Sequence, residues 1–274
     1  MGFNVKILCE NSISRGEGLV AEHGLSLYIE GGRRAILFDT GQGIGIRRNA
    51  RLLGIDLKGI EAIVLSHAHY DHTGGIREVL QGEMRIVAHP EVFLPKYALR
   101  KGRYRYIGLP FSKEAIEGWG GQMELGRDPQ EVIPGVFTTG EVPRVTPFEG
   151  PSDDLFVKEG ERFLQDEMKD DLSLFIDTPE GVVVILGCAH AGLINILTHI
   201  KDLTGRGHFL TILGGTHLGY LPPSRREEVF KALKDFEIKG IGISHCTGLS
   251  TAFSLREHFQ GDIFFANVGF SASF

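Results

Sequence analysis

The sequence predicts an α/β protein in which functional side chains gather where short strands end. Two observations predict this class. Five short apolar runs, rich in β-branched residues, each end in a turn that holds His, Asp, Cys or Thr beside Gly. Several of these turns are followed by the 3.6-residue apolar period of a helix. Because binding sites in α/β proteins collect at the carboxyl ends of strands, the five turns are candidates for a functional site.

The first two runs lie close together in the first third of the chain. "AILFDTG" (35–41) ends in Asp39, and "IEAIVLSHAHYDHTGG" (60–75) ends in a cluster of histidines. A short helical pattern, "IREVLQG" (76–82), follows the second run. We therefore expect two strands and one helix in this part of the chain.

The third run begins the last third of the chain. "GVVVILGCAHAG" (181–192) ends in Cys188 and His190. The next stretch, "LINILTHIKDL" (193–203), has apolar residues at helical spacing, which predicts a helix with one buried face.

The last two runs have the same form. "HFLTILGGTHLG" (208–219) ends in Thr216 and His217, and "IKGIGISHCTG" (238–248) ends in His245. A protein that stored histidines in its core would scatter them over strand interiors. Their position at strand ends therefore favours a site.

Composition argues against several other classes of protein. The chain of 274 residues has 29 basic and 35 acidic residues and a net charge of −6, whereas nucleic-acid binders usually show a basic surplus. No run approaches the roughly 20 apolar residues of a transmembrane helix. The N-terminus is too polar for a signal peptide. Three sparse cysteines fit a reducing compartment. These features predict a cytoplasmic protein without nucleic-acid or membrane partners.

One stretch departs from the alternating pattern. Residues 90–165 are rich in Pro, Gly and charge, and we expect them to form an insertion or lid on a single domain spanning 1–274. Within this stretch, basic residues alternate with tyrosines over 96–106. Arg103 and Arg105 are predicted to face an anionic substrate, because arginine binds phosphate with two parallel hydrogen bonds. The alternative is a solvated charged loop.

The densest group of functional side chains is the motif "HAHYDH", which contains His67, His69, Asp71 and His72. Imidazole nitrogen and carboxylate oxygen are ligands that suit zinc, manganese or iron(II). A tight turn after a strand directs alternate side chains toward a common point. The two pairs in the motif can serve two neighbouring ions, so the sequence predicts a metal site.

The motif and its surroundings resemble the metallo-β-lactamase superfamily of metal-dependent hydrolases. The resemblance rests on Asp39 in "LFDTG", on the "HAHYDH" motif, and on the later strand-end residues His190 and His245. It implies a four-layer αβ/βα sandwich, here with an inserted loop or helical segment, and a two-metal site along one edge.

More narrowly, the chain is similar to one branch of that superfamily. "DTGQG", "LSHAHYDHTGG", "LGCAHAGLINIL" and "SHCTG" carry this similarity. Members of the branch are labelled dihydropterin–ribofuranosylaminobenzene-phosphate synthase-like. The label implies joining a dihydropterin to a ribosylated aminobenzene phosphate, with loss of diphosphate, in methanopterin biosynthesis.

The resemblance to the superfamily implies a role for each residue of the motif. His67 and His69 would bind the first ion. Asp71 and His72 would bind the second, and Asp71 would also orient the reacting water as the catalytic residue. His245 stands where the last histidine of the second ion is expected.

Other positions follow the superfamily less closely. Asp39 would orient the motif turn, a role in which such partners tune metal ligands. Most two-metal relatives carry a bridging aspartate where this chain reads "GCAH" (187–190), and a further histidine where it reads "DEMKDDLSLF" (166–175). We assign His190 to the vacant metal position. Cys188 is either a soft metal ligand or a small buried residue at a tight turn.

These residues predict a hydrolase with two divalent ions, zinc or alternatively manganese or iron. The ions would activate water, or a phosphate leaving group, on a small anionic substrate such as a phosphate or diphosphate ester with a flat ring. The branch's synthase activity is one alternative, and a non-enzymatic metal- or ligand-binding protein is another. His23, Arg144, Thr216 and His217 are expected to complete the substrate pocket.

Overall fold

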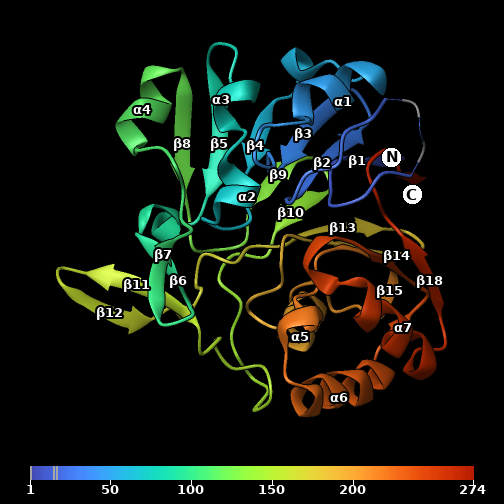
Figure 1. Ribbon diagram of the computed structural model, residues 1–274. Coiled ribbons are helices and arrows are strands. Elements are labelled where there is room, and N and C mark those ends of the chain that lie inside the picture. The colour runs from blue at the N-terminus through green and yellow to red at the C-terminus, as the bar shows by residue number, and fades with distance from the viewer. Residues whose placement is uncertain (1, 15, 17) are drawn as a thin grey trace.

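Two β-sheets packed face to face, with helices on both outer faces, form the body of the protein (Figure 1). The computed structural model describes residues 2–14, 16 and 18–274. The strands of the first sheet are β1 (Phe3–Cys9), β2 (Ser26–Gly31), β3 (Arg34–Phe38), β4 (Ala62–Val64), β5 (Met84–Ala88), β8 (Gly121–Leu125) and β19 (Ser271–Ser273). Their order is β19-β1-β2-β3-β4-β5-β8.

The second sheet is built mainly from the C-terminal half of the chain. Its strands are β9 (Glu131–Ile133), β10 (Val136–Thr138), β13 (Leu174–Thr178), β14 (Gly181–Leu186), β15 (His208–Gly214), β16 (Glu237–Ile238), β17 (Gly240–Ile243) and β18 (Asp262–Phe265). Their order is β18-β17-β15-β14-β13-β10-β9, and β16 pairs with β15.

Each sheet has a parallel part, and these parts carry all five of the predicted strand ends. Strands β3, β4, β5 and β8 pair in parallel in the first sheet. Strands β14, β15, β17 and β18 do so in the second. Parallel strands end at the same edge of a sheet, which brings the turns after β3, β4, β14, β15 and β17 together.

Helices cover the outer face of each sheet, which gives the predicted four-layer sandwich. The first sheet is covered by α1 (Ile46–Leu52), α3 (Ile76–Val79) and α4 (Lys113–Gly118), and the second by α5 (Leu193–Thr204), α6 (Pro223–Ala232) and α7 (Leu249–His258). Shorter segments are α2 (Tyr70–Thr73) and the 3₁₀ turns η1 (Leu57–Gly59), η2 (Pro90–Phe93), η3 (Leu218–Tyr220), η4 (Leu233–Asp235) and η5 (His245–Thr247). Among the helices that the structure describes, none is both long enough and apolar enough to cross a membrane.

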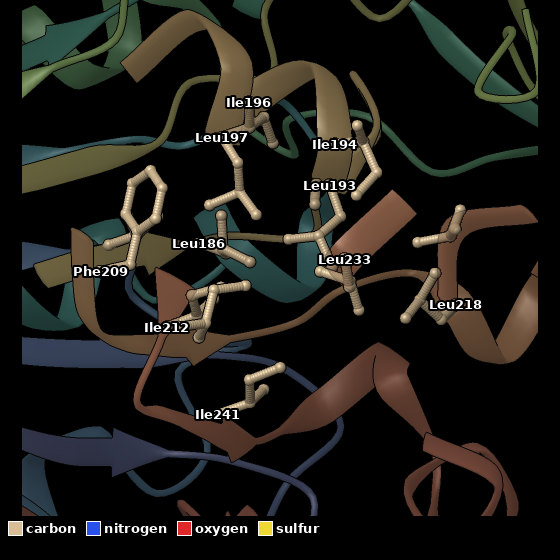
Figure 2. Close-up of a cluster of buried hydrophobic side chains, with 14 of the residues drawn as sticks. Leu186, Leu193, Ile194, Ile196, Leu197, Phe209, Ile212, Leu218, Leu233 and Ile241 are labelled. Atoms are coloured by element: carbon tan, nitrogen blue, oxygen red, sulfur yellow. The ribbon is translucent and has the colours of Figure 1, made fainter. Parts of the chain in front are cut away.

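Helix α5 forms where the apolar spacing predicts a helix. Leu193, Ile196, Leu197 and Ile200 are buried on one face and pack with side chains from β14 and β15 (Figure 2). Gly205 ends the helix in the left-handed conformation, with a φ of 67° that favours glycine. The helix covers the second sheet directly after the turn that holds His190.

A third, smaller sheet projects from one side of the sandwich (Figure 1). It contains β6 (Lys96–Arg100), β7 (Arg103–Tyr106), β11 (Leu155–Glu159) and β12 (Arg162–Gln165), in the order β12-β11-β6-β7. This small sheet contains only part of the segment 90–165 that was expected to form an insertion. Strands β8, β9 and β10 of that segment belong to the two main sheets instead. Val132, Ile133 and Val136 are buried between those sheets, whereas β7 is exposed throughout.

Phe38 tests the packing of the sheets against each other. It is fully buried between them and precedes Asp39. We expect Phe38→Ala to lower the free energy of unfolding by about 3–5 kcal/mol, because the lost contacts leave a cavity. Leu249→Ala, at a residue that is 61% exposed, should stay within about 0.5 kcal/mol of the unmodified protein. Chemical denaturation measures both, and equally small losses would contradict the assignment of Phe38 to the core.

Candidate metal centre

The predicted strand ends meet along a pocket of about 460 Å³ at one edge of the sandwich. Four turns contribute to its lining: those after β4, β14, β15 and β17. The side chains from these turns are His69, Tyr70, Asp71, Cys188, Ala189, His190, Thr216, His217, His245 and Cys246. Both sheets therefore supply functional groups to one cavity.

The backbone of the motif turn changes from extended to helical between His69 and Tyr70. His69, the residue before α2, has extended angles, whereas Asp71 and His72 lie within the single turn of that helix. Side chains before and inside the helix consequently point in different directions. His67 and His69 join one group of potential ligands, and Asp71 joins another.

The first group consists of three imidazoles. Ligand atoms of His67, His69 and His190 all lie within 4.8 Å of one another. Nε2 of His67 is 3.0 Å from Nδ1 of His69. Among the described residues, Nε2 of His69 and Nε2 of His190 are buried without a hydrogen-bond partner. Because buried polar atoms are almost always satisfied, these free nitrogens fit a site for a cation.

The second group lies beside the first. Nε2 of His245 is 3.2 Å from Nε2 of His72 and 3.4 Å from Oδ2 of Asp71. Nε2 of His23 is 3.1 Å from the same carboxylate oxygen. The side chain of His23 is 48% exposed, so this residue stands at the mouth of the pocket. The predicted trio of Asp71, His72 and His245 is thus brought together, and His23 adjoins it.

Cys188 lies between the two groups. Its Sγ is 3.2 Å from Nε2 of His72. The same sulfur clusters with His67 and His72 on one side, and with His245 and Cys246 on the other. Cys188 is buried, which agrees with a small buried residue at a tight turn. Its sulfur also faces both donor groups, which agrees with a soft metal ligand.

Asp39, which is expected to orient the motif, is hydrogen-bonded to it at two places. Its Oδ1 accepts a hydrogen bond from Ser66 N at 2.7 Å, and its Oδ2 accepts one from Ser66 Oγ at 2.6 Å. Oδ2 also lies 2.7 Å from Nδ1 of His72, which leaves Nε2 of that ring for the site. Ser66 Oγ is in turn 2.8 Å from Nδ1 of His67. One carboxylate is therefore connected to a potential ligand of each group, directly to His72 and through Ser66 to His67.

Burial sets the charge state of the first group. It lowers the pKa of His67 and of His190 well below the usual value, and that of His69 to about 3, because an imidazolium ion loses its hydration there. Neighbouring histidines add to the shift for His67 and His190. These rings are neutral at physiological pH, which is the form that binds metal.

The second group is dominated by charge pairs. Burial raises the pKa of Asp71, but hydrogen bonds from His23 and His245 outweigh it and hold that pKa well below the usual range. Burial also opposes a charge on His72, yet the Asp39 carboxylate raises the pKa of that ring to about 9. The second group thus contains an ionised carboxylate, and a cation that binds Nε2 of His72 would displace a proton from that ring.

Comparison with known proteins agrees with this geometry. A family model described as "Metallo-beta-lactamase superfamily" matches residues 20–237. The chain belongs to the metallo-β-lactamase superfamily.

Several relatives are similar over nearly the whole chain. A 7,8-dihydropterin-6-methyl-4-(β-D-ribofuranosyl)-aminobenzene-5'-phosphate synthase of Methanocaldococcus jannaschii is 34% identical over 274 residues, covering 94% of this chain and 93% of that protein. The crystal structure of Tm1679, described as a metal-dependent hydrolase of the β-lactamase superfamily, matches with a TM-score of 0.85 and 28% identity over 98% of both chains. Zn²⁺-bound PqqB from Methylobacterium extorquens shares the fold of the superfamily, with a TM-score of 0.57 and 14% identity over 98% of this chain and 99% of that one.

Some of the expected substrate residues line the pocket. His23, Thr216, His217 and Arg105 do so. The ring of His217 lies 4.2 Å from that of His190, centroid to centroid. Arg103 is exposed and is not among the lining residues, so only one arginine of the predicted pair faces this cavity.

Arg144 does not act as the expected anion clamp. Its guanidinium nitrogens donate to four main-chain carbonyl oxygens, at 2.9–3.0 Å, and Arg144 does not line the pocket. These acceptors belong to Glu149, Glu167, His190 and Ala191. The side chain therefore holds the turn that carries His190 instead of lining the pocket.

The tyrosine-rich stretch also serves the fold more than the pocket. Tyr104 stacks on Phe163 with a centroid distance of 3.7 Å, and Tyr97 meets Tyr106 edge to face at 5.4 Å. None of these rings lines the pocket among the described residues. These rings pack against one another within the small sheet, so they offer no stacking surface for a heterocycle in this pocket.

Other pocket residues were missed by the sequence analysis. Tyr70 lies inside the metal motif and lines the pocket, 6.0 Å from the guanidinium of Arg105. Tyr220 and Arg225 line the side formed by η3 and α6. The sequence could have indicated Tyr220 and Arg225, because both follow the strand-end residue His217 within eight positions.

Removal of the Asp39 carboxylate tests its orienting role. Asp39→Ala takes away the acceptor shared by Ser66 and His72, so we expect metal affinity to fall about 10–100-fold. Competition with a chromophoric chelator measures this change. Asp202→Ala, at an exposed position of α5, is the control and should bind metal like the unmodified protein. Unchanged affinity in Asp39→Ala would show that the carboxylate does not orient the ligands.

Proposed function

We propose that this protein is a metal-dependent enzyme that acts on a small anionic substrate through two divalent ions. The first ion would be held by His67, His69 and His190, and the second by Asp71, His72 and His245. The observation that carries the proposal is the adjacency of these two donor groups at one pocket. Imidazole and carboxylate donors favour zinc, with manganese or iron as alternatives.

The residues divide the chemistry between them. When bound, a pair of divalent ions supplies activated water and positive charge for the attacking and leaving oxygens. Asp71, held ionised by His23 and His245, would orient that water from the pocket side. His67 and His72 are fully buried, so bulk water is kept from the protected side of the centre.

Positive charge at the pocket supports an anionic substrate. Arg105 and Arg225 both line the cavity, and neither forms an ion pair with any residue that the structure describes. Arg100 also lines it but is paired with Asp154. Free guanidinium groups bind phosphate with two parallel hydrogen bonds, which favours a phosphate or diphosphate ester over a neutral ester.

Two activities use the same centre in different ways. In a hydrolase, water attacks the substrate directly, and similarity to Tm1679 supports this form. In a synthase, the ions would neutralise a departing diphosphate while a second substrate is joined, and 34% identity to the Methanocaldococcus synthase supports that form. We favour the hydrolase as the main proposal and keep the synthase as the alternative.

The number of ions tests the two-group model. We expect protein reconstituted with zinc to approach two ions per chain, because two donor groups converge side by side. Elemental analysis after removal of loose metal gives the ratio. His69→Ala should keep the fold, since the core of a chain this long does not depend on a metal, and should retain one ion. A maximum of one ion in the unmodified protein would contradict the model.

Arg105 and Arg103 form a matched pair for testing substrate class, because only Arg105 lines the pocket. We expect Arg105→Gln to raise KM for phosphate esters roughly tenfold, about the value of one charge-assisted hydrogen bond. KM for neutral carboxylic esters should change little. Arg103→Gln should leave both unchanged.

Steady-state kinetics on a panel of phosphoesters, diphosphates and carboxylic esters, with zinc or manganese, provides the measurement. Diphosphate release that requires both a dihydropterin and a ribosylated aminobenzene phosphate would favour the synthase. Metal binding without turnover of any of these compounds would favour a non-enzymatic role.

A further inference from the structure

The segment Asp166–Asp171 adjoins the metal centre and carries three buried carboxylates. Asp166, Asp170 and Asp171 are each no more than 2% exposed. Carboxylates are seldom fully buried unless they are paired, so their partners indicate what they do. None of the three belongs to either donor group.

Asp170 connects the small sheet to the motif turn. Its Oδ1 accepts a hydrogen bond from Lys96 Nζ at 2.6 Å, and its Oδ2 accepts one from Ala68 N at 2.9 Å. Ala68 stands between His67 and His69 in the chain. This bond therefore fixes the main chain from which two imidazoles of the first group extend.

Asp171 makes the corresponding contact with the other turn. Its Oδ2 accepts a hydrogen bond from Ala191 N at 2.9 Å, directly after His190. Arg144 strengthens this connection, because one of its nitrogens donates to Glu167 O and to His190 O, both at 2.9 Å. Two adjacent carboxylates thus hold the two turns that supply the first group.

Asp166 lacks such a connection. Its Oδ2 accepts a hydrogen bond from the same Lys96 Nζ at 2.8 Å, but its Oδ1 accepts one from Met168 N at 2.8 Å, within its own loop. Asp166 and Asp170 therefore share one cation, and only Asp170 reaches a metal-binding turn.

We propose that Asp170 and Asp171 are positioning residues that fix the distance between the two turns of the first donor group and so determine its affinity for an ion. The inference rests on the proposed function, since it requires an ion in that group. Three neutral imidazoles on two separate turns would drift apart or relax toward other partners without such a restraint. Groups that orient ligands typically change metal affinity about 10–100-fold.

A matched pair of variants separates positioning from general stability. Asp170→Asn leaves one carbonyl oxygen for two donors, Lys96 Nζ and Ala68 N. Asp166→Asn weakens the same pairing with Lys96 but leaves the motif turn untouched. We expect both to lose stability in chemical denaturation. Of these two variants, only Asp170→Asn should bind one of its two ions about 10–100-fold more weakly. A third variant, Asp171→Leu, removes the acceptor of Ala191 N at similar volume and should weaken the binding of that ion by a similar factor.

Chelator competition with zinc and the visible absorption of cobalt-loaded protein supply readouts that do not depend on activity. If Asp170→Asn does not fold, Asp170→Glu keeps the charge beside Lys96 while its longer side chain displaces Ala68, and the same loss is expected. Equal losses in the Asp166 and Asp170 variants, or unchanged affinity in the Asp170 and Asp171 variants, overturn this inference alone. An unmodified protein that binds no ion overturns the proposed function and this inference with it.

Discussion

The arrangement of the candidate metal centre depends on one buried carboxylate, that of Asp39. It receives three hydrogen bonds, two from Ser66 and one from the ring of His72, so both ends of the motif are fixed to the end of β3. Asp39 itself has a φ of 60°, in the left-handed region that non-glycine residues seldom adopt. Tertiary contacts must maintain that conformation, and the three hydrogen bonds supply them.

The two sheets contribute unequal shares of the centre. The first sheet supplies the whole motif from a single turn, whose internal geometry is local. The second sheet supplies His190 and His245 from separate strands, so their positions relative to the motif are set by sheet packing and by the loops between. Such long-range placement requires additional restraints. Arg144 and Asp171 are hydrogen-bonded to the turn that carries His190, and Asp170 is hydrogen-bonded to the motif turn that faces it.

The parts of the site that follow from local spacing were predictable, and those that depend on distant partners were not. Strand-end histidines and the face of α5 could be inferred because apolar periodicity and turn residues are local signals. Arg144 and Lys96 looked like free cations in sequence, yet their partners lie 23 or more positions away in the chain or are main-chain carbonyls. Likewise, the aromatic partner of Tyr104 comes from β12, 59 positions later. Nothing in a basic, tyrosine-rich stretch indicates that a neighbouring hairpin will pack against its rings.

Lys96 connects the small sheet to the candidate metal centre. A fully buried lysine is unfavourable unless its charge is matched, and here two carboxylates surround its ammonium group. Lys96 belongs to β6, the strand that brings Arg100 to the pocket. The ion pairs of Lys96 with the two carboxylates therefore fix this strand in place. Through Asp170, Lys96 also fixes the main chain of the metal motif. The pocket wall formed by β6 and the first donor group therefore share one anchor, the ammonium group of Lys96.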